Sequence, residues 1–132
     1  MTDHSKSILV EPEGGRHYDM RSMRARFLAD EDETAARYSI SEWWLAPRSD
    51  GPGAHSHAEH DDIFYVLAGA VSFLIGENWT VVETGGFVRV GRGTVHDYRN
   101  DTDGPARILN IYIPGGFERD MPAIVDWFSR NP

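Results

Sequence analysis

Short segments of β-branched, aromatic and aliphatic residues recur along this chain, and each is followed within a few residues by glycine, proline, asparagine or aspartate. The segments are 23–27, 38–45, 63–67, 71–75, 79–83, 87–90, 95–99 and 107–113. Strand-forming runs at intervals of about eight to twelve residues, with turn-forming residues between them, are typical of antiparallel sandwiches and barrels. The pattern therefore predicts an all-β fold.

A segment near the C-terminus has helical periodicity instead. Its apolar residues recur at the i, i+3, i+4 and i+7 positions of one helix face, and they are Met121, Ile124, Val125 and Phe128. Pro122 fits only the first turn of such a helix, where the missing N–H is not needed. We expect a short C-terminal helix against the outside of the barrel. The length of 132 residues corresponds to one domain, which we assign to 16–132 after a loose lead-in at 1–15.

Composition and charge exclude several functions. Thirteen Lys and Arg residues against 21 Asp and Glu residues give a net charge of −8, which repels the phosphates of nucleic acids and anionic membrane surfaces. We therefore expect neither nucleic-acid nor membrane partners. The absence of cysteine excludes disulfides, thiolate zinc sites, iron–sulfur clusters and cysteine nucleophiles. It is compatible with the cytoplasmic location that we expect for a chain without a visible secretory signal.

Some of the predicted strands are apolar on both faces. In 63–67 both sets of alternate side chains are apolar. One face of this strand can therefore fill the interior, while the other face needs something else to shield it from water. We expect a second copy of the chain to supply this cover in a homodimer.

The densest chemical signal lies between residues 52 and 62, where three histidines and several acidic residues occur. Alternate residues of a strand point to the same face, so His55 and His57 would present two imidazoles side by side. Four residues then separate His57 from Asp62, which is enough for a tight turn that returns a carboxylate to the same place. His-x-His pairs are common and usually only solvated, so this pair needs further ligands to indicate a site.

A third imidazole comes from the segment 95–99. There the alternation puts His96 and Tyr98 on one face and charged residues on the other, as in a half-exposed strand. Three imidazoles and one carboxylate leave one or two open positions on a six-coordinate divalent metal, and substrate or dioxygen can bind there. We therefore assign His55, His57, Asp62 and His96 as metal ligands, and Tyr98 as a catalytic candidate.

Together these residues resemble the two sequence motifs of the cupin superfamily. The first motif, G(X)5HXH(X)3–4E(X)6G, is similar to His55-Ser56-His57, four residues, Asp62, six residues and Gly69. The second motif, G(X)5PXG(X)2H(X)3N, is similar to Gly85, five residues, Gly91-Arg92-Gly93, two residues, His96, three residues and Asn100. The resemblance covers 53–100. It implies a small single-domain jelly-roll barrel, an antiparallel double-sheet β-barrel, that holds one divalent ion of iron, manganese, nickel, copper or zinc.

Three positions depart from these motifs. Ser49 stands where the first motif has its glycine, with Gly51 nearby, and Gly91 replaces the proline of the second motif. Asp62 replaces a glutamate and is one methylene shorter. Asp62 therefore either binds the metal or only hydrogen-bonds a ligand histidine or a bound water, and Glu59 is a substitute ligand.

The resemblance does not choose an activity by itself, because cupins include quercetin-type dioxygenases, oxalate-degrading enzymes, isomerases, lyases and non-catalytic binding proteins. The ligand set with open positions favours a metal-dependent oxidoreductase that activates dioxygen against a small organic substrate. The alternatives are a non-catalytic protein that binds metal or a small molecule, and an isomerase or lyase.

Two further features concern the substrate. Aromatic residues can line a pocket for an aromatic compound, although strand cores are rich in such residues anyway; they are Trp43, Trp44, Phe64, Phe73, Tyr98 and Tyr112. Glu42 is a second catalytic candidate if Ile40, Glu42 and Trp44 face inward, since a buried carboxylate can act as a base. The opposite alternation would place Glu42 on the surface.

Overall fold

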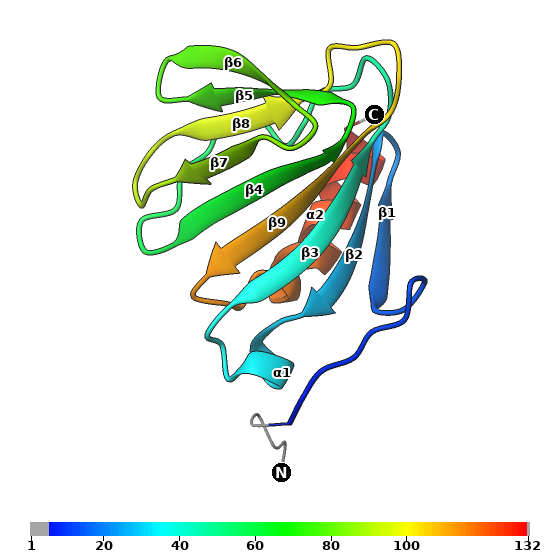
Figure 1. Ribbon diagram of the computed structural model, residues 1–132, viewed down its shortest axis with the longest axis vertical. Helices are drawn as coiled ribbons and strands as arrows, with labels where there is room; N and C mark the ends of the chain where they lie inside the picture. Colours follow the sequence, from blue (N-terminus) through cyan, green and yellow to red (C-terminus); the bar gives the residue numbers. More distant parts are fainter. Residues whose placement is uncertain (1–5, 132) are drawn as a thin grey trace.

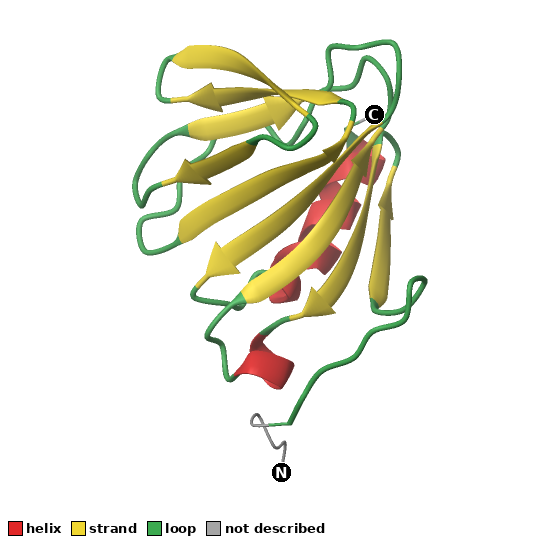
Figure 2. Ribbon diagram, in the orientation of Figure 1, coloured by secondary structure: helices red, strands yellow, loops and turns green. Residues whose placement is uncertain are grey.

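The computed structural model describes residues 6–131 and shows two antiparallel sheets with a C-terminal helix (Figure 1, Figure 2). The strands are β1 (Arg16–Met20), β2 (Met23–Ala29), β3 (Ser39–Leu45), β4 (Asp61–Ala68), β5 (Ala70–Ile75), β6 (Asn78–Glu83), β7 (Phe87–Val90), β8 (His96–Arg99) and β9 (Ala106–Ile113). The helices are α1 (Glu31–Thr34), the 3-10 turn η1 (Glu118–Asp120) and α2 (Met121–Arg130). Part of the predicted lead-in, residues 1–5, and residue 132 lie outside the described residues.

The strands form a large sheet in the order β1-β2-β3-β9-β4-β7 and a small sheet in the order β6-β5-β8. Strands distant in the chain are neighbours, since β9 lies between β3 and β4, and this crossover arrangement is that of a jelly roll. No ladder of backbone hydrogen bonds joins the two sheets into one closed barrel within residues 6–131. The all-β prediction is confirmed in the form of a two-sheet jelly roll.

Alternation along the strands separates the interior of the fold from its outer faces. In β4 the side chains of Asp62, Phe64 and Val66 are buried, and their neighbours on the strand are more exposed. Inward side chains of the two sheets meet where the rings of Phe64 on β4 and Phe73 on β5 lie 5.2 Å apart. The pocket and the histidine cluster described below occupy this interior space.

The alternation in β3 places Glu42 on the outer face of the large sheet. Ser41 and Trp43 are buried, whereas Glu42 forms an ion pair with Arg26 of β2 at 3.3 Å. The catalytic assignment of Glu42 required the opposite alternation. The structure does not bring this carboxylate to the interior, because Trp43 and Leu45 share the inward face of the strand with Ser41.

The C-terminal helix forms where its periodicity predicts, but it lies on the inner side of the large sheet (Figure 1). Met121 and Phe128 of α2 are buried in the same core cluster as Phe27 and Trp43, and Ile124 packs against that cluster. The expectation that the helix packs against the outside of the barrel is therefore wrong. The physical reason is that a three-stranded sheet cannot cover the inner face of a six-stranded one, so α2 covers the apolar surface near β1 to β3.

Asp30, at the N-terminus of α1, holds the chain segment that precedes α2. Its carboxylate is 2% exposed and accepts backbone hydrogen bonds from Gly116 at 2.6 Å and from Glu118 at 2.5 Å. The Asp30 backbone N–H is bound in turn by the Glu33 side chain at 3.1 Å. These bonds connect the end of β2 to the start of α2, which are far apart in the chain.

We predict that Asp30→Asn lowers the free energy of unfolding by about 2 kcal/mol. An amide offers one oxygen acceptor where the carboxylate has two, so one buried N–H loses its partner. Urea unfolding of the variant beside wild type measures the change, with Asp32→Asn on the exposed side of α1 as the matched control. An Asp30 variant as stable as the control would contradict this role.

The outer face of the large sheet carries exposed apolar side chains. Tyr65 on β4 and Phe87 on β7 are register partners and are 42% and 64% exposed, and Ile113 on β9 is 37% exposed. This is the second apolar face that the sequence indicated for 63–67. The single chain does not test the homodimer, which stays a prediction.

Candidate metal centre

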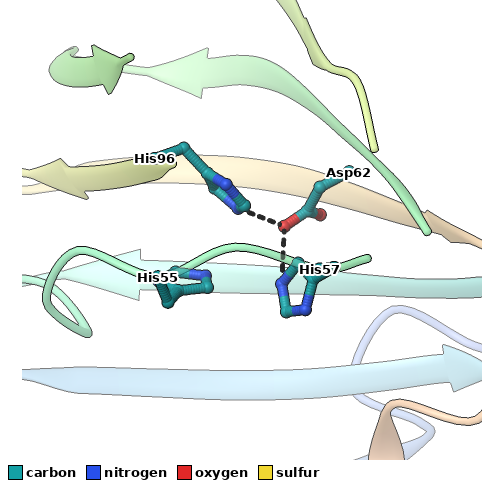
Figure 3. Close-up of side chains that lie close together, drawn as sticks. All are labelled: His55, His57, Asp62 and His96. Atoms are coloured by element: carbon teal, nitrogen blue, oxygen red, sulfur yellow. Dashed lines mark hydrogen bonds and ion pairs between the residues drawn. The ribbon is translucent and has the colours of Figure 1, made fainter. Parts of the chain in front are cut away.

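Four side chains from three parts of the chain converge between the two sheets (Figure 3). His55 and His57 come from the connection between β3 and β4, Asp62 from β4, and His96 from the first residue of β8. Each of the four offers one ligand atom, and these atoms all lie within 4.8 Å of one another. The structure thus brings together the four residues that the sequence assigned as ligands.

The histidine pair is fixed by backbone pairing with β8 rather than by a strand of its own. His55 and His96 form an isolated antiparallel bridge, with reciprocal N–H to oxygen bonds of 2.9 and 2.8 Å. Gly93, in the turn before β8, donates its N–H to the carbonyl of His57 at 2.8 Å. The extended backbone at 55–57 therefore places both rings on one side, as the alternation predicts.

The second ring nitrogen of each histidine is bound on the side away from the centre. Nδ1 of His55 donates to the carbonyl of Gly53 at 2.7 Å, and Nδ1 of His96 donates to that of Thr94 at 3.0 Å. Nδ1 of His57 lies 3.2 Å from the hydroxyl of Tyr112. Such outer partners fix ring orientation and leave Nε2 to face a metal ion.

Two observations show that the centre fits a divalent cation. Nε2 of His57 is buried and has no hydrogen-bond partner, although buried nitrogens of this kind are normally satisfied. An Asp62 oxygen lies 3.0 Å from Nε2 of His96 and 3.7 Å from Nε2 of His57, so negative charge faces the imidazoles. Imidazole nitrogens with one carboxylate are a donor set that suits iron, manganese, nickel, copper or zinc.

Asp62 is oriented by an amide that sequence analysis missed. Its Oδ1 accepts from Nδ2 of Asn110 at 2.6 Å, which leaves Oδ2 toward His57 and His96. Asn110 lies on the inward face of β9 between Ile108 and Tyr112, and a lone amide on the apolar face of a strand was the signal available in the sequence. The geometry is consistent with both roles left open for Asp62, as metal ligand and as partner of His96.

The protonation of the imidazoles follows from their surroundings. Burial lowers the pKa of His57, and this outweighs the attraction of Asp62, so His57 is neutral near pH 7. Burial also lowers the pKa of His96, but the hydrogen bonds to Asp62 and to the Thr94 carbonyl outweigh it and leave the pKa above its usual value of 6.5. A metal at this centre therefore competes with a proton on His96.

We predict that metal affinity rises with pH up to the pKa of His96 and levels off above it. Below that pKa one proton leaves for each metal bound, so the apparent affinity changes by about tenfold per pH unit. Isothermal titration with Zn²⁺ in buffers of different ionisation enthalpy measures both the affinity and the released protons. An affinity that is constant from acidic to neutral pH would exclude His96 from the ligand set.

A model of the cupin domain matches residues 41–112, which contain all four clustered residues. The chain belongs to the cupin family. Among curated proteins, quercetin 2,3-dioxygenase of Bacillus subtilis is 27% identical over 116 residues, which cover 81% of this chain and 34% of that protein. The chain thus spans about a third of the length of that relative.

Solved structures of other cupins share the fold. KdgF from Halomonas superposes with a TM-score of 0.74 at 16% identity, covering 87% of this chain and 99% of that one. A protein from Thermotoga maritima described as a predicted oxalate decarboxylase superposes with a TM-score of 0.70 at 17% identity, covering 83% and 99%. At these identities the likeness establishes the jelly-roll fold alone.

The cluster of His55, His57, Asp62 and His96 borders an apolar cavity of about 290 Å³. The cavity reaches from His55, Asp62 and Asn110 to Trp43 on β3 and Trp127 on α2. Tyr98, the catalytic candidate two residues after His96, lines the same cavity, and burial raises the pKa of its phenol. Tyr98 therefore keeps its proton at neutral pH and can donate a hydrogen bond into the cavity.

The remaining acidic and histidine candidates lie around the cluster. Glu59, the substitute ligand, is exposed and is not part of the group of close ligand atoms. His60 stacks on the ring of Tyr112 at 4.2 Å, and Tyr112 contacts His57. The sequence indicated Tyr112 only as a residue that can line a pocket, whereas in the structure its hydroxyl contacts the ring of His57, a candidate ligand.

We predict that Tyr112→Phe weakens metal binding about tenfold without unfolding the protein. The change removes only the hydroxyl that orients His57, and outer partners of ligand histidines contribute about 10–100-fold to metal affinity. Competition with a chelating dye measures the affinity, and Tyr65→Phe on the outer face is the control. Equal affinities for the two variants would show that the Tyr112 contact does not support the centre.

Proposed function

We propose that this cupin is a metal-dependent oxidoreductase of the dioxygenase type that acts on a small organic substrate. The observation that carries the proposal is the convergence of three imidazoles and one carboxylate beside an apolar cavity. The 27% identity with quercetin 2,3-dioxygenase over 81% of the chain supports the same chemistry.

The ligands would be Nε2 of His55, His57 and His96, with Asp62 as the fourth donor or as the group that orients His96. A redox-active divalent ion held by these residues would supply the activation of dioxygen and of the oxygen atoms of a substrate. The cavity lined by His55 and Asp62 offers space for the substrate beside these residues.

The chain's own residues supply binding and protection from water. Phe64 and Trp43 give the cavity apolar walls, which strengthen polar contacts made inside it. The protonated phenol of Tyr98 can donate a hydrogen bond to a substrate oxygen. Asn110 keeps Asp62 in one orientation through its bond to Oδ1.

The second candidate is a cupin that binds metal or a small molecule without turnover. The observation that favours it is Asp62 itself, because its Oδ2 lies within hydrogen-bond distance of His96 and a shorter carboxylate in that role would leave a three-histidine site. An isomerase or lyase is the third candidate, and it would use the same cavity.

We further propose that the protein is cytoplasmic. The net charge of −8 supports the expectation that it has neither nucleic-acid nor membrane partners. Within residues 6–131, none of the helices combines the length and hydropathy needed to span a bilayer.

The test combines metal analysis with oxygen uptake. Protein reconstituted separately with iron, manganese, nickel, copper and zinc is mixed with a panel of catechols, enols and enediols in an oxygen electrode cell. We expect substrate-dependent oxygen consumption with at least one redox-active metal and none with zinc. Full metal occupancy without oxygen consumption across the panel would overturn the proposal and favour the binding protein.

A further inference from the structure

The lining of the cavity divides into two halves of different chemistry. The polar groups belong to His55, Asp62 and Asn110, and the last two lie on β4 and β9. The apolar end is built by Trp43, Phe117, Ile124, Trp127 and Phe128, most of them in or next to α2, which contacts β1 at the far edge of the large sheet. A ligand that fills the whole cavity must therefore carry its polar atoms at one end and an apolar group at the other.

The two halves also differ in their relation to the family. The polar residues fall within the matched residues 41–112, whereas Phe117, Ile124, Trp127 and Phe128 lie beyond them. Most of the apolar end therefore comes from the C-terminal segment, outside the residues that the family model matches. Differences in ligand choice are expected at the part of a site that the shared fold does not dictate.

Trp127 is the unusual member of the apolar end. It lines the cavity and yet remains 50% exposed, while its neighbour Phe128 is buried and anchors α2 in the core. The two rings meet edge to face at 5.0 Å, so Phe128 supports one side of the Trp127 indole. An indole in this position gains cover when an aromatic ligand enters the cavity.

We propose that Trp127 is the specificity-determining residue of this site, and that the preferred substrate is a fused-ring aromatic compound with oxygen atoms at one end. The inference rests on the proposed function for the placement of those oxygens at the histidine cluster. The cavity of about 290 Å³ is at the small end of ligand pockets, which span about 300–1,000 Å³. It therefore suits a compact two-ring compound better than a large conjugate.

A matched pair of probes tests the proposal by binding alone. Catechol and 2,3-dihydroxynaphthalene carry the same two oxygens and differ by one fused ring. Protein loaded with Zn²⁺ gives no redox turnover, so isothermal titration reports affinity only. We expect the naphthalene diol to bind at least about tenfold tighter than catechol, because the second ring reaches the apolar end.

Trp127→Ala is expected to remove most of this preference and to leave the affinity for catechol within about twofold. Trp127→Phe should keep most of the preference, since an aromatic surface remains. Trp79→Ala is the matched control, because Trp79 is a half-exposed tryptophan on β6 that does not line the cavity. Thermal unfolding of each variant shows whether α2 stays in place.

Three results would overturn the inference: equal affinities for the two diols, a preference that survives in Trp127→Ala, and an equal loss for both diols in that variant. None of these results depends on oxygen consumption. A protein that shows the preference with zinc but consumes no oxygen with any metal would keep the inference and overturn the dioxygenase proposal.

Discussion

His96→Ala is expected to lower metal affinity by at least about a hundredfold, so that the dialysed variant carries almost no metal. His96 is 2% exposed, and its Nε2 faces the other ligand atoms across a short distance. Loss of an outer partner alone costs about 10–100-fold in affinity, and loss of a ligand exceeds that. Elemental analysis after dialysis, together with titration of Zn²⁺, measures the effect.

His17→Ala is the control, because His17 lies on β1, is not part of the cluster, and its ring hydrogen-bonds the carbonyl of Glu13 at 2.9 Å. His57→Ala provides a second variant at a more accessible ligand, and it should show the same loss. Circular dichroism establishes that both ligand variants remain folded. Full metal occupancy in a folded His96→Ala protein would show that the ligand assignment is wrong.

Gly51→Ala is expected to destabilise the protein by about 3 kcal/mol or more. A Cβ atom at Gly51 would lie 1.8 Å from the backbone oxygen of Tyr98, which is a contact that no side-chain rotation can relieve. The loop from 49 to 55 must then move away from β8, although Ser49 pairs with Asn100 just after that strand and His55 pairs with His96 in it. Forced overpacking commonly costs about 1–3 kcal/mol, and a backbone obstacle places this case at the upper end.

The matched control is Gly91→Ala, since a Cβ atom there meets nothing within 4 Å. That variant should unfold at the same denaturant concentration as wild type or slightly above it. We expect Gly51→Ala to lower the melting temperature by about 10 °C and to weaken metal binding, because it displaces His55. Equal stability of the two variants would contradict the close approach of the loop to β8.

Most strands were predictable because their inward and outward residues differ in polarity. The segment 87–90 coincides with β7, and the segments 63–67 and 107–113 lie inside β4 and β9. Strand β1 was missed because its residues are mostly exposed and show no apolar alternation. Helix α1 was missed as well, although Asp30 followed by Glu33 is a capping pair that marks a helix start.

Which face of a strand points inward, and on which side of the sheet the helix packs, were harder to predict than the strands themselves. Both alternations of β3 contain a tryptophan, Trp43 or Trp44, so polarity did not tell which face is inward. The position of Glu42 depended on that choice. The side on which α2 lies depended on how much of the large sheet the small sheet covers, and no local pattern carries that information.

Three of the candidate ligands, His55, His57 and Asp62, were predictable because they lie close in the chain and their chemistry is unusual. His96 was predictable because the turn before it resembles the second cupin motif. The supporting contacts were not predictable in the same way. Asn110 reaches Asp62, and Tyr112 reaches His57, only because β9 lies beside β4 in the sheet.

The sequence by itself determined an all-β chain with a terminal helix and the four residues that form the candidate centre, because alternation, turns and ligand spacing are encoded over a few neighbouring residues. Only the tertiary structure decided which face of β3 is inward, where α2 packs and which residues build the apolar end of the cavity. These outcomes depend on contacts between segments that are distant in the chain, and such contacts follow from the packing of the whole fold rather than from any local pattern.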